Sequence, residues 1–164
     1  MKMYKRLAKK ISYAPVKRKK KIVKTIYIHG TGNKGDTAKN NVDFYATGNE
    51  RIAGAHFFID RDGKIGRSIP MNRIAYAVGD MNNNTYSVSI ELCDIYNKYP
   101  SKKQIKATIK LIKYIKRYCK NVHHIKRHYD SNGKLCPNIM CGNNQKDKVW
   151  KQFLIDIGFS KGVM

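Results

Sequence analysis

Segments of strand character alternate with segments of helical character along this chain, and this alternation constrains the fold more than any other feature. Residues 22–29, 55–59 and 87–92 are rich in β-branched and aromatic residues, as buried strands are. Residues 102–119 carry apolar side chains three or four positions apart, which predicts an amphipathic helix. Strands alternating with helices predict a single α/β domain with a central mixed β-sheet flanked by helices.

Shorter elements are expected between these segments. Residues 36–47 have the pattern of a short helix with Asp36 as its N-cap, and residues 146–157 that of a final helix. The Asp-Gly pair within residues 61–64 predicts a tight turn, after which the chain pairs with strand 55–59 to form a hairpin. In strand 87–92 the alternation puts Val88, Ile90 and Leu92 on one face and Ser87, Ser89 and Glu91 on the other. The apolar stripe of the long helix comprises Ile105, Ile109, Ile112, Ile115 and Cys119.

The charge of the chain is extreme and unevenly distributed. The 34 Lys and Arg residues exceed the 11 Asp and Glu residues by 23, and residues 1–24 hold eleven of the basic residues and none of the acidic ones. We interpret residues 1–21 as a basic N-terminal arm, either solvated or an electrostatic anchor, and residues 22–160 as the folded domain. A hydrophobic content of 41% argues against a disordered polycation. The charge predicts attraction to nucleic acid, an anionic membrane or an anionic cell wall.

Two histidines and one cysteine have the chemistry of a metal site. His29 ends the first predicted buried strand, and His128 and Cys136 stand eight residues apart in a later segment. Two imidazoles and one thiolate suit zinc, and three protein ligands leave one position for water, as in catalytic zinc sites. Taken singly, a histidine at a strand end is more often structural, so spacing alone leaves both interpretations open.

Four segments together resemble a known family. They are IYIHGTG, AGAHFFIDRDGKI, SVSIELC and RHYDSNGKLCP, which occur in the order found in the zinc-dependent N-acetylmuramoyl-L-alanine amidases. The resemblance covers about residues 22–157 and is strongest to phage and prophage endolysins of Gram-positive bacteria. It implies the fold that these amidases share with peptidoglycan recognition proteins, and one bound Zn²⁺.

The resemblance also implies roles for individual residues. His29, His128 and Cys136 match the zinc ligands, Lys134 matches the lysine that stabilises the oxyanion, and Glu91 matches a general base. Other branches of the family carry a tyrosine before the hairpin histidine, where this chain has Ala55. That departure favours Glu91 as the proton carrier, with a buried salt bridge as the alternative for this carboxylate.

Several candidates have weaker support. His56 matches a histidine of the family hairpin and is expected either to bind substrate or to be structural, while Thr31, Asn33 and the loop around residues 76–84 are candidates for the substrate groove. His123 and His124 are expected in a strand or loop. Three cysteines are expected as unliganded thiols, namely Cys93, Cys119 and Cys141.

Two other functions compete with the amidase. The spacings Cys119-x3-His123 and Cys136-x4-Cys141 allow a structural zinc module that binds nucleic acid, but they match no common finger and leave Glu91 unexplained. A non-catalytic peptidoglycan-binding protein of the same fold typically lacks the thiolate ligand that this chain retains.

The remaining expectations concern the partners and the place of action. We expect a monomer that binds peptidoglycan, with teichoic acids as additional anionic partners and no specific nucleic acid. No apolar run reaches the ~18–20 residues of a membrane span, and the basic N-terminus lacks the apolar stretch of a signal peptide. We therefore expect an enzyme that accumulates in the cytoplasm, reaches the wall after holin-type permeabilisation, and has no C-terminal wall-binding domain.

Overall fold

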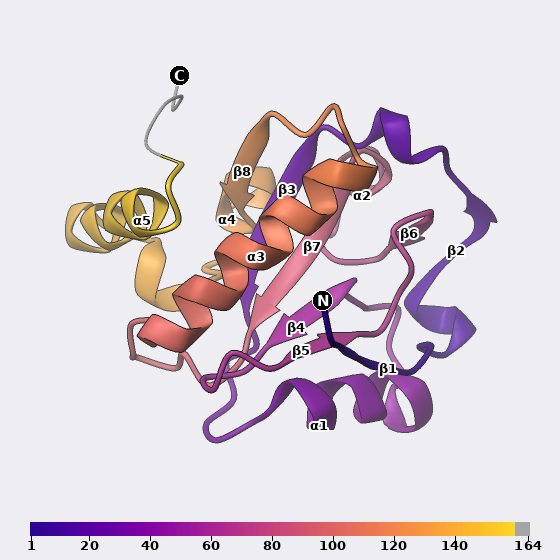
Figure 1. Cartoon of the computed structure of the whole chain (residues 1–164), viewed down its shortest axis with the longest axis horizontal. Coiled ribbons are helices and arrows are strands. Elements are labelled where there is room, and N and C mark those ends of the chain that lie inside the picture. The colour runs from indigo at the N-terminus through magenta and orange to yellow at the C-terminus, as the bar shows by residue number, and fades with distance from the viewer. Residues whose placement is uncertain (160–164) are drawn as a thin grey trace.

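The computed structural model describes residues 1–159, which form two sheets and a set of helices around them (Figure 1). The predicted domain end at residue 160 lies just outside this range. The strands are β1 (Tyr4–Lys5), β2 (Tyr13–Lys17), β3 (Thr25–Gly30), β4 (Phe57–Ile59), β5 (Ile65–Arg67), β6 (Arg73–Ala75), β7 (Ser87–Leu92) and β8 (His124–Arg127). The α-helices are α1 (Ala38–Asp43), α2 (Met81–Thr85), α3 (Lys102–Tyr118), α4 (Tyr129–Asn132) and α5 (Asn144–Asp156). Short helical turns span Lys10–Ser12, Lys20–Ile22, Phe44–Gly48 and Asn138–Met140.

The main sheet is mixed, as predicted. Its order is β1-β5-β4-β7-β3-β8, in which β4, β7, β3 and β8 run parallel and β5 pairs antiparallel with β4. The tight turn between β4 and β5 contains Gly63 at a φ of 77°, a conformation that glycine adopts without strain. Strands β2 and β6 form a separate antiparallel pair. The α/β class and the central mixed sheet flanked by helices are confirmed.

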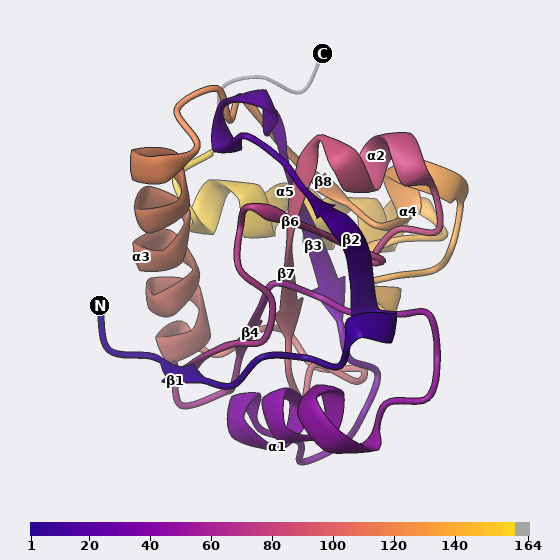
Figure 2. The ribbon, with the colours of Figure 1, turned by 90° about the vertical axis from the view of Figure 1, so that its right-hand side faces the viewer.

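The two faces of the sheet are covered by different helices. Helices α3 and α5 pack on one face with Ile28, Ile90 and Leu92 in the largest core cluster. Helix α1 covers part of the other face, where Val42 packs against Phe58. Figure 2 shows α3 on one side of the sheet and α2 and α4 on the other. The alternation predicted for strand 87–92 therefore decides which side chains enter the core and which face the opposite side.

Two helices begin or pack differently from the prediction. The N-cap of α1 is Thr37 rather than Asp36, because the Thr37 hydroxyl accepts the Asn40 N–H while the Asp36 carboxylate accepts the Asp94 N–H. In α3 the buried face includes Gln104 and Thr108, and Ile105 and Ile109 lie at its margin. The Gln104 amide donates to backbone carbonyls of Ile59 and Cys93, which makes its burial acceptable.

The basic N-terminal segment is not a solvated arm. β1 adds to the edge of the main sheet by pairing with β5, and β2 pairs with β6. The Arg18 side chain is buried and donates hydrogen bonds to the carbonyls of Met71, Asn84, Thr85 and Ser87. The net charge of the segment does not predict this role, because a guanidinium whose N–H groups are hydrogen-bonded tolerates burial that a charge without partners does not.

Candidate active site

The candidate site lies where three neighbouring parallel strands end. His29 and Glu91 are the penultimate residues of β3 and β7 and stand directly opposite each other in the strand register. His128 follows the last residue of β8. The carboxyl ends of parallel strands are the usual place for ligand sites in α/β sheets. The side chains of His29 and Glu91 project from the face of the sheet opposite α3. The sheet therefore separates the site from the core that α3 covers.

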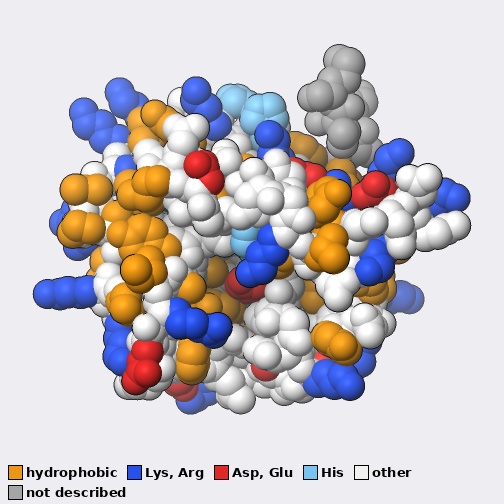
Figure 3. Space-filling view, turned by 180° about the vertical axis from the view of Figure 1, so that it is seen from behind, with side chains coloured by type: hydrophobic (Ala, Val, Ile, Leu, Met, Phe, Trp, Pro, Cys, Tyr) orange, Lys and Arg blue, Asp and Glu red, His pale blue; other side chains and the backbone are white. Residues whose placement is uncertain are grey.

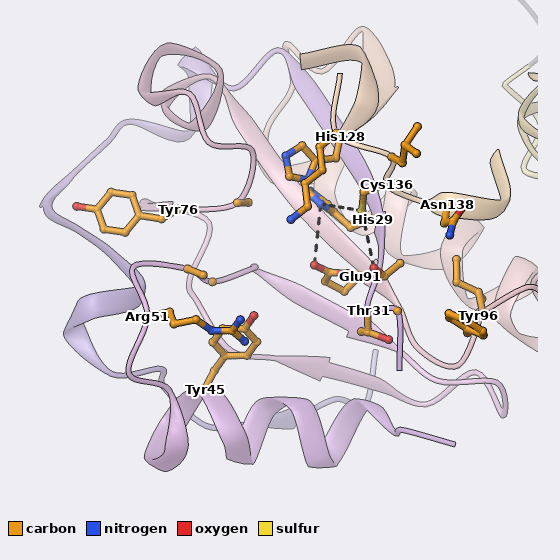
Figure 4. A pocket seen from close by; sticks show the side chains of 18 residues that line it. His29, Thr31, Tyr45, Arg51, Tyr76, Glu91, Tyr96, His128, Cys136 and Asn138 are labelled. Atoms are coloured by element: carbon orange, nitrogen blue, oxygen red, sulfur yellow. Dashed lines mark hydrogen bonds and ion pairs between the residues drawn. The ribbon is translucent and has the colours of Figure 1, made fainter. Parts of the chain in front are cut away.

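His29, His128 and Cys136 form a compact cluster of potential metal ligands (Figure 4). Their ligand atoms all lie within 4.8 Å of one another. The His29 Nδ1 lies 3.8 Å from the Cys136 Sγ, and the two imidazole rings meet edge to face with centroids 4.8 Å apart. The tertiary structure thus brings together the three residues that the sequence singled out as ligands.

The electrostatics of this cluster fit a cation. Burial lowers the pKa of His29 and lowers that of His128 to about 4, so both rings are in the neutral form that binds metals. The Nε2 atoms of both rings are buried and have no hydrogen-bond partner. Burial, reinforced by Glu91, raises the pKa of Cys136 to about 12, and a bound cation would reverse that effect. Two nitrogens and one sulfur are donors that zinc prefers.

Glu91 is the carboxylate of the site. One oxygen, Oε1, lies 3.9 Å from His29 Nδ1, and the other, Oε2, is buried without a hydrogen-bond partner. Burial raises the pKa of Glu91 to about 8, and the positive charge of Lys134 opposes that rise. The contact with His29 is too long for a hydrogen bond and involves a neutral ring, so it does not make Glu91 a structural ion pair. Glu91 is poised to exchange a proton near neutral pH.

Lys134 lines the same cavity from the loop that precedes Cys136. Its side chain is exposed, and its backbone N–H donates to the Asn132 side chain over 3.1 Å. The Lys134 charge lowers the pKa of Glu91, His29 and His128. A flexible cation at the mouth of the cavity can meet negative charge that develops on a substrate.

The site opens into a cavity of about 410 Å³. Figure 3 shows histidine, acidic and basic side chains gathered in a hollow at the centre of the face opposite α3. Thr31 lines this cavity, whereas Asn33 lines a neighbouring one of about 580 Å³. The two cavities share Thr31, Glu91, Tyr45 and Arg51, so they form a continuous groove. From the loop expected in the groove wall, Tyr76 and Ala77 line the cavity, but residues 81–85 form helix α2.

Tyr45 and Arg51 are lining residues that the sequence interpretation missed. The Tyr45 ring stacks on Phe58 with centroids 5.5 Å apart. Burial raises the pKa of its hydroxyl to about 12, so the group remains protonated. No local signal marks Arg51, which reaches the groove only because the segment before β4 passes opposite the ends of β3 and β7 (Figure 4).

His56 lines neither cavity of the groove, and its ring contacts backbone groups instead. It is 1% exposed, its Nδ1 accepts the Ser89 N–H, and its Nε2 lies 3.1 Å from the Arg73 carbonyl oxygen. Burial and the adjacent Arg18 lower its pKa to about 3, so the ring is neutral. Of the two expectations for His56, these contacts favour the structural role over substrate binding.

The alternative zinc module is not formed. Cys119 is buried in the core next to α3, and the Cys141 thiol donates to the Pro137 carbonyl oxygen. Within residues 1–159, the metal-compatible cluster is the one at His29, and it includes neither Cys119, His123 nor Cys141. His124 begins β8, as expected of a strand residue, and Cys93, Cys119 and Cys141 are free thiols.

The fold and this cluster define an α/β domain of the amidase type, with a carboxylate beside a candidate metal centre. The chain belongs to the N-acetylmuramoyl-L-alanine amidase family, whose sequence model matches residues 18–139. This confirms the family that the four sequence segments indicated.

Individual relatives agree with this assignment. The chain is 30% identical over 131 residues to the N-acetylmuramoyl-L-alanine amidase XlyB of Bacillus subtilis, covering 76% of this chain and 40% of that protein. It is 32% identical over 120 residues to the amidase CwlA of the same species, covering 69% and 42%. The chain therefore spans about two fifths of the length of these relatives.

Solved structures share the fold. The structure of PlyL superposes with a TM-score of 0.78 at 24% identity, covering 96% of this chain and 97% of that one. The solution structure of the PlyG catalytic domain also gives a TM-score of 0.78, at 23% identity, covering 100% and 98%.

Proposed function

We propose that this chain hydrolyses the amide bond between N-acetylmuramic acid and L-alanine in bacterial peptidoglycan, with one zinc ion as cofactor. The proposal is carried by one observation: His29, His128, Cys136 and Glu91 meet at the ends of three parallel strands, in one groove. Family membership supports the same bond, because the matching relatives are named for it.

His29, His128 and Cys136 would hold the zinc ion, which acts when bound as a Lewis acid that activates water and polarises the amide carbonyl. The chain thus supplies three ligands and leaves one side of the cluster facing the groove.

Glu91 performs the proton transfers. Its carboxylate takes a proton from the attacking water and delivers it to the nitrogen of L-alanine as that amine leaves. A pKa raised by burial suits both steps, because the group must accept and then release a proton. Lys134 stabilises the negative charge that develops on the carbonyl oxygen.

The biological setting belongs to the proposal as well. We infer a phage or prophage endolysin that reaches the wall after the membrane is permeabilised. Among the helices of residues 1–159, none has both the length and the apolar character needed to cross a bilayer. The net charge of +23 would hold the enzyme on anionic wall polymers such as teichoic acids.

The decisive experiment follows the turbidity of purified Gram-positive cell walls. We expect the turbidity to fall when the protein is added and a chelator to stop that fall. Adding zinc should then restore lysis, so that the turbidity falls again. Mass spectrometry of the soluble products should show new N-terminal L-alanine and intact lactyl-muramic acid. Walls that remain turbid, or fragments cut within the glycan or between amino acids, would refute the proposal.

A further inference from the structure

Another cavity, of about 550 Å³, lies on the far side of the molecule between the N-terminus and α3. Four lysines line it, namely Lys2, Lys103, Lys106 and Lys110. All four side chains are exposed. The basic N-terminal segment and the lysine-rich helix are far apart in the sequence, yet they contribute to one surface.

Two features of the fold create this concentration of charge. Lys103, Lys106 and Lys110 are three and four positions apart, so they lie above one another on one face of α3. The pairing of β1 with β5 then carries Lys2 alongside this face. Figure 2 shows the N-terminus beside α3.

The positive charge of this cavity is not neutralised by the protein. Asp62 is the acidic residue in its lining, and its carboxylate lies 3.5 Å from Lys103 Nζ. Both side chains are about 70% exposed, so that ion pair is weak. Like charges three and four positions apart also destabilise a helix. A cavity that keeps four lysines against one aspartate is suited to an anion with several charges.

We propose that this cavity binds the phosphate groups of a polyol-phosphate polymer of the cell wall. The proposal rests on the proposed function, which places the protein at the wall. Lysine ammonium groups bind phosphate as point charges, without demanding a fixed orientation. The cavity lining contains no aromatic side chain on which a nucleic acid base would stack, and this favours the wall polymer over single-stranded nucleic acid.

The position of this cavity leaves the catalytic groove free. In β7, Ile90 and Leu92 face the core under α3, whereas Glu91 faces the groove on the other side of the sheet. A polymer held along α3 therefore does not cover the groove. The face that carries α3 would bind the wall polymer, while the opposite face, which carries the groove, would hydrolyse peptidoglycan.

The test measures binding of fluorescent poly(glycerol phosphate) to the whole protein at low ionic strength. The variant replaces Lys103, Lys106 and Lys110 with Gln, and a matched control replaces Lys120, Lys148 and Lys151, so that both lose three charges. We expect the first variant to lose about tenfold in affinity and the control to change by less than about twofold, since a localised site depends on nearby charges.

Two results would overturn the site. Equal losses in both variants would mean that the polymer responds to net charge and not to this cavity. Tighter binding of a single-stranded oligonucleotide of equal charge, lost in the first variant, would assign the cavity to nucleic acid.

Circular dichroism checks that both variants are folded, and a single K106E variant repeats the test with one change. Hydrolysis of a soluble muramyl peptide is measured separately, so failure of the amidase proposal is recognised independently of polymer binding.

Discussion

At the scale of single residues, the site consists of groups whose burial is not compensated by the protein. The unpartnered Nε2 atoms of His29 and His128 and the unpartnered Oε2 of Glu91 lie at the floor of the groove. His56, by contrast, is equally buried but satisfied at both ring nitrogens. Uncompensated burial is costly and is retained where a ligand or a reaction supplies the missing partner.

The first prediction concerns the carboxylate. Glu91→Gln keeps the shape of the side chain but removes the proton acceptor, so we expect the turnover rate to fall by about 10²–10⁴-fold. Zinc content, measured by atomic emission, should stay that of the parent protein because Glu91 is not a ligand. The matched control is Glu50→Gln, which changes an exposed glutamate. Near-full wall lysis by Glu91→Gln would show that Glu91 does not carry out the proton transfers.

The second prediction concerns the thiol. Cys136→Ser replaces a soft sulfur ligand by a hydroxyl, so we expect zinc affinity to fall by more than about tenfold. Cys119→Ser is the control, because that thiol lies in the core away from the cluster. Competition with a chromogenic chelator measures both affinities. Equal zinc binding by the two variants would contradict the assignment of Cys136 as a ligand.

At the scale of elements, the N-terminal segment is part of the domain. Buried Arg18 joins the segment after β2 to the Met71 carbonyl before β6, to the carbonyls of Asn84 and Thr85 at the end of α2, and to that of Ser87 at the start of β7. At the other end, Asp43 of α1 accepts hydrogen bonds from Tyr4 and Arg6 beside β1. These contacts tie β1 and β2 to elements that carry the groove.

The third prediction follows from the Arg18 contacts. Arg18→Met leaves several buried carbonyls without donors, so we expect the free energy of unfolding to fall by about 2–4 kcal/mol. Urea titration measures this loss, with the exposed Lys19→Met as the control. If both variants unfold at the same urea concentration, the N-terminal segment contributes little to stability.

The fourth prediction is a pH dependence. Hydrogen bonds from Lys39, Tyr4 and Arg6 hold the pKa of Asp43 well below its usual value near 4. Because the folded state favours the ionised form, this contribution is present above the usual pKa and is lost as the pH falls below it. We expect the parent protein to be more stable than Asp43→Asn at neutral pH. The difference should close in acid, and a gap independent of pH would exclude this role of Asp43.

At the scale of the whole molecule, the sheet separates two surfaces with different chemistry. The groove with Glu91 occupies one face, and the lysine-lined cavity by α3 lies beyond the other. Charge on the α3 side therefore lies apart from the groove, as the proposed binding of a wall polymer there requires.

The fifth prediction distinguishes adhesion from chemistry. Salt screens interactions between exposed charges, so we expect lysis of intact walls to weaken as ionic strength rises through the physiological range. Hydrolysis of a small soluble muramyl peptide should change much less. Parallel assays across a salt series test this, and an identical response of both substrates would contradict adhesion through the basic surface.

The sequence by itself determined the fold class, the family and the zinc-ligand candidates. β-Branched and aromatic residues marked β3, and apolar periodicity marked β7 and α3. Both signals arise because these elements bury one face or both, and burial selects apolar residues at regular local positions. The motifs named His29, His128 and Cys136, which the structure brings within 4.8 Å of one another.

The tertiary structure decided the rest. It placed the basic N-terminus in the sheet, buried Arg18 and His56 against each other, and brought Arg51 into the groove. It also joined Lys2 to the lysines of α3. Each of these outcomes depends on contacts between residues far apart in the chain. Composition and local pattern determine the chemistry of each side chain and its preference for helix or strand. The contacts that a side chain makes are determined only when the order of the strands in the sheet brings distant segments together.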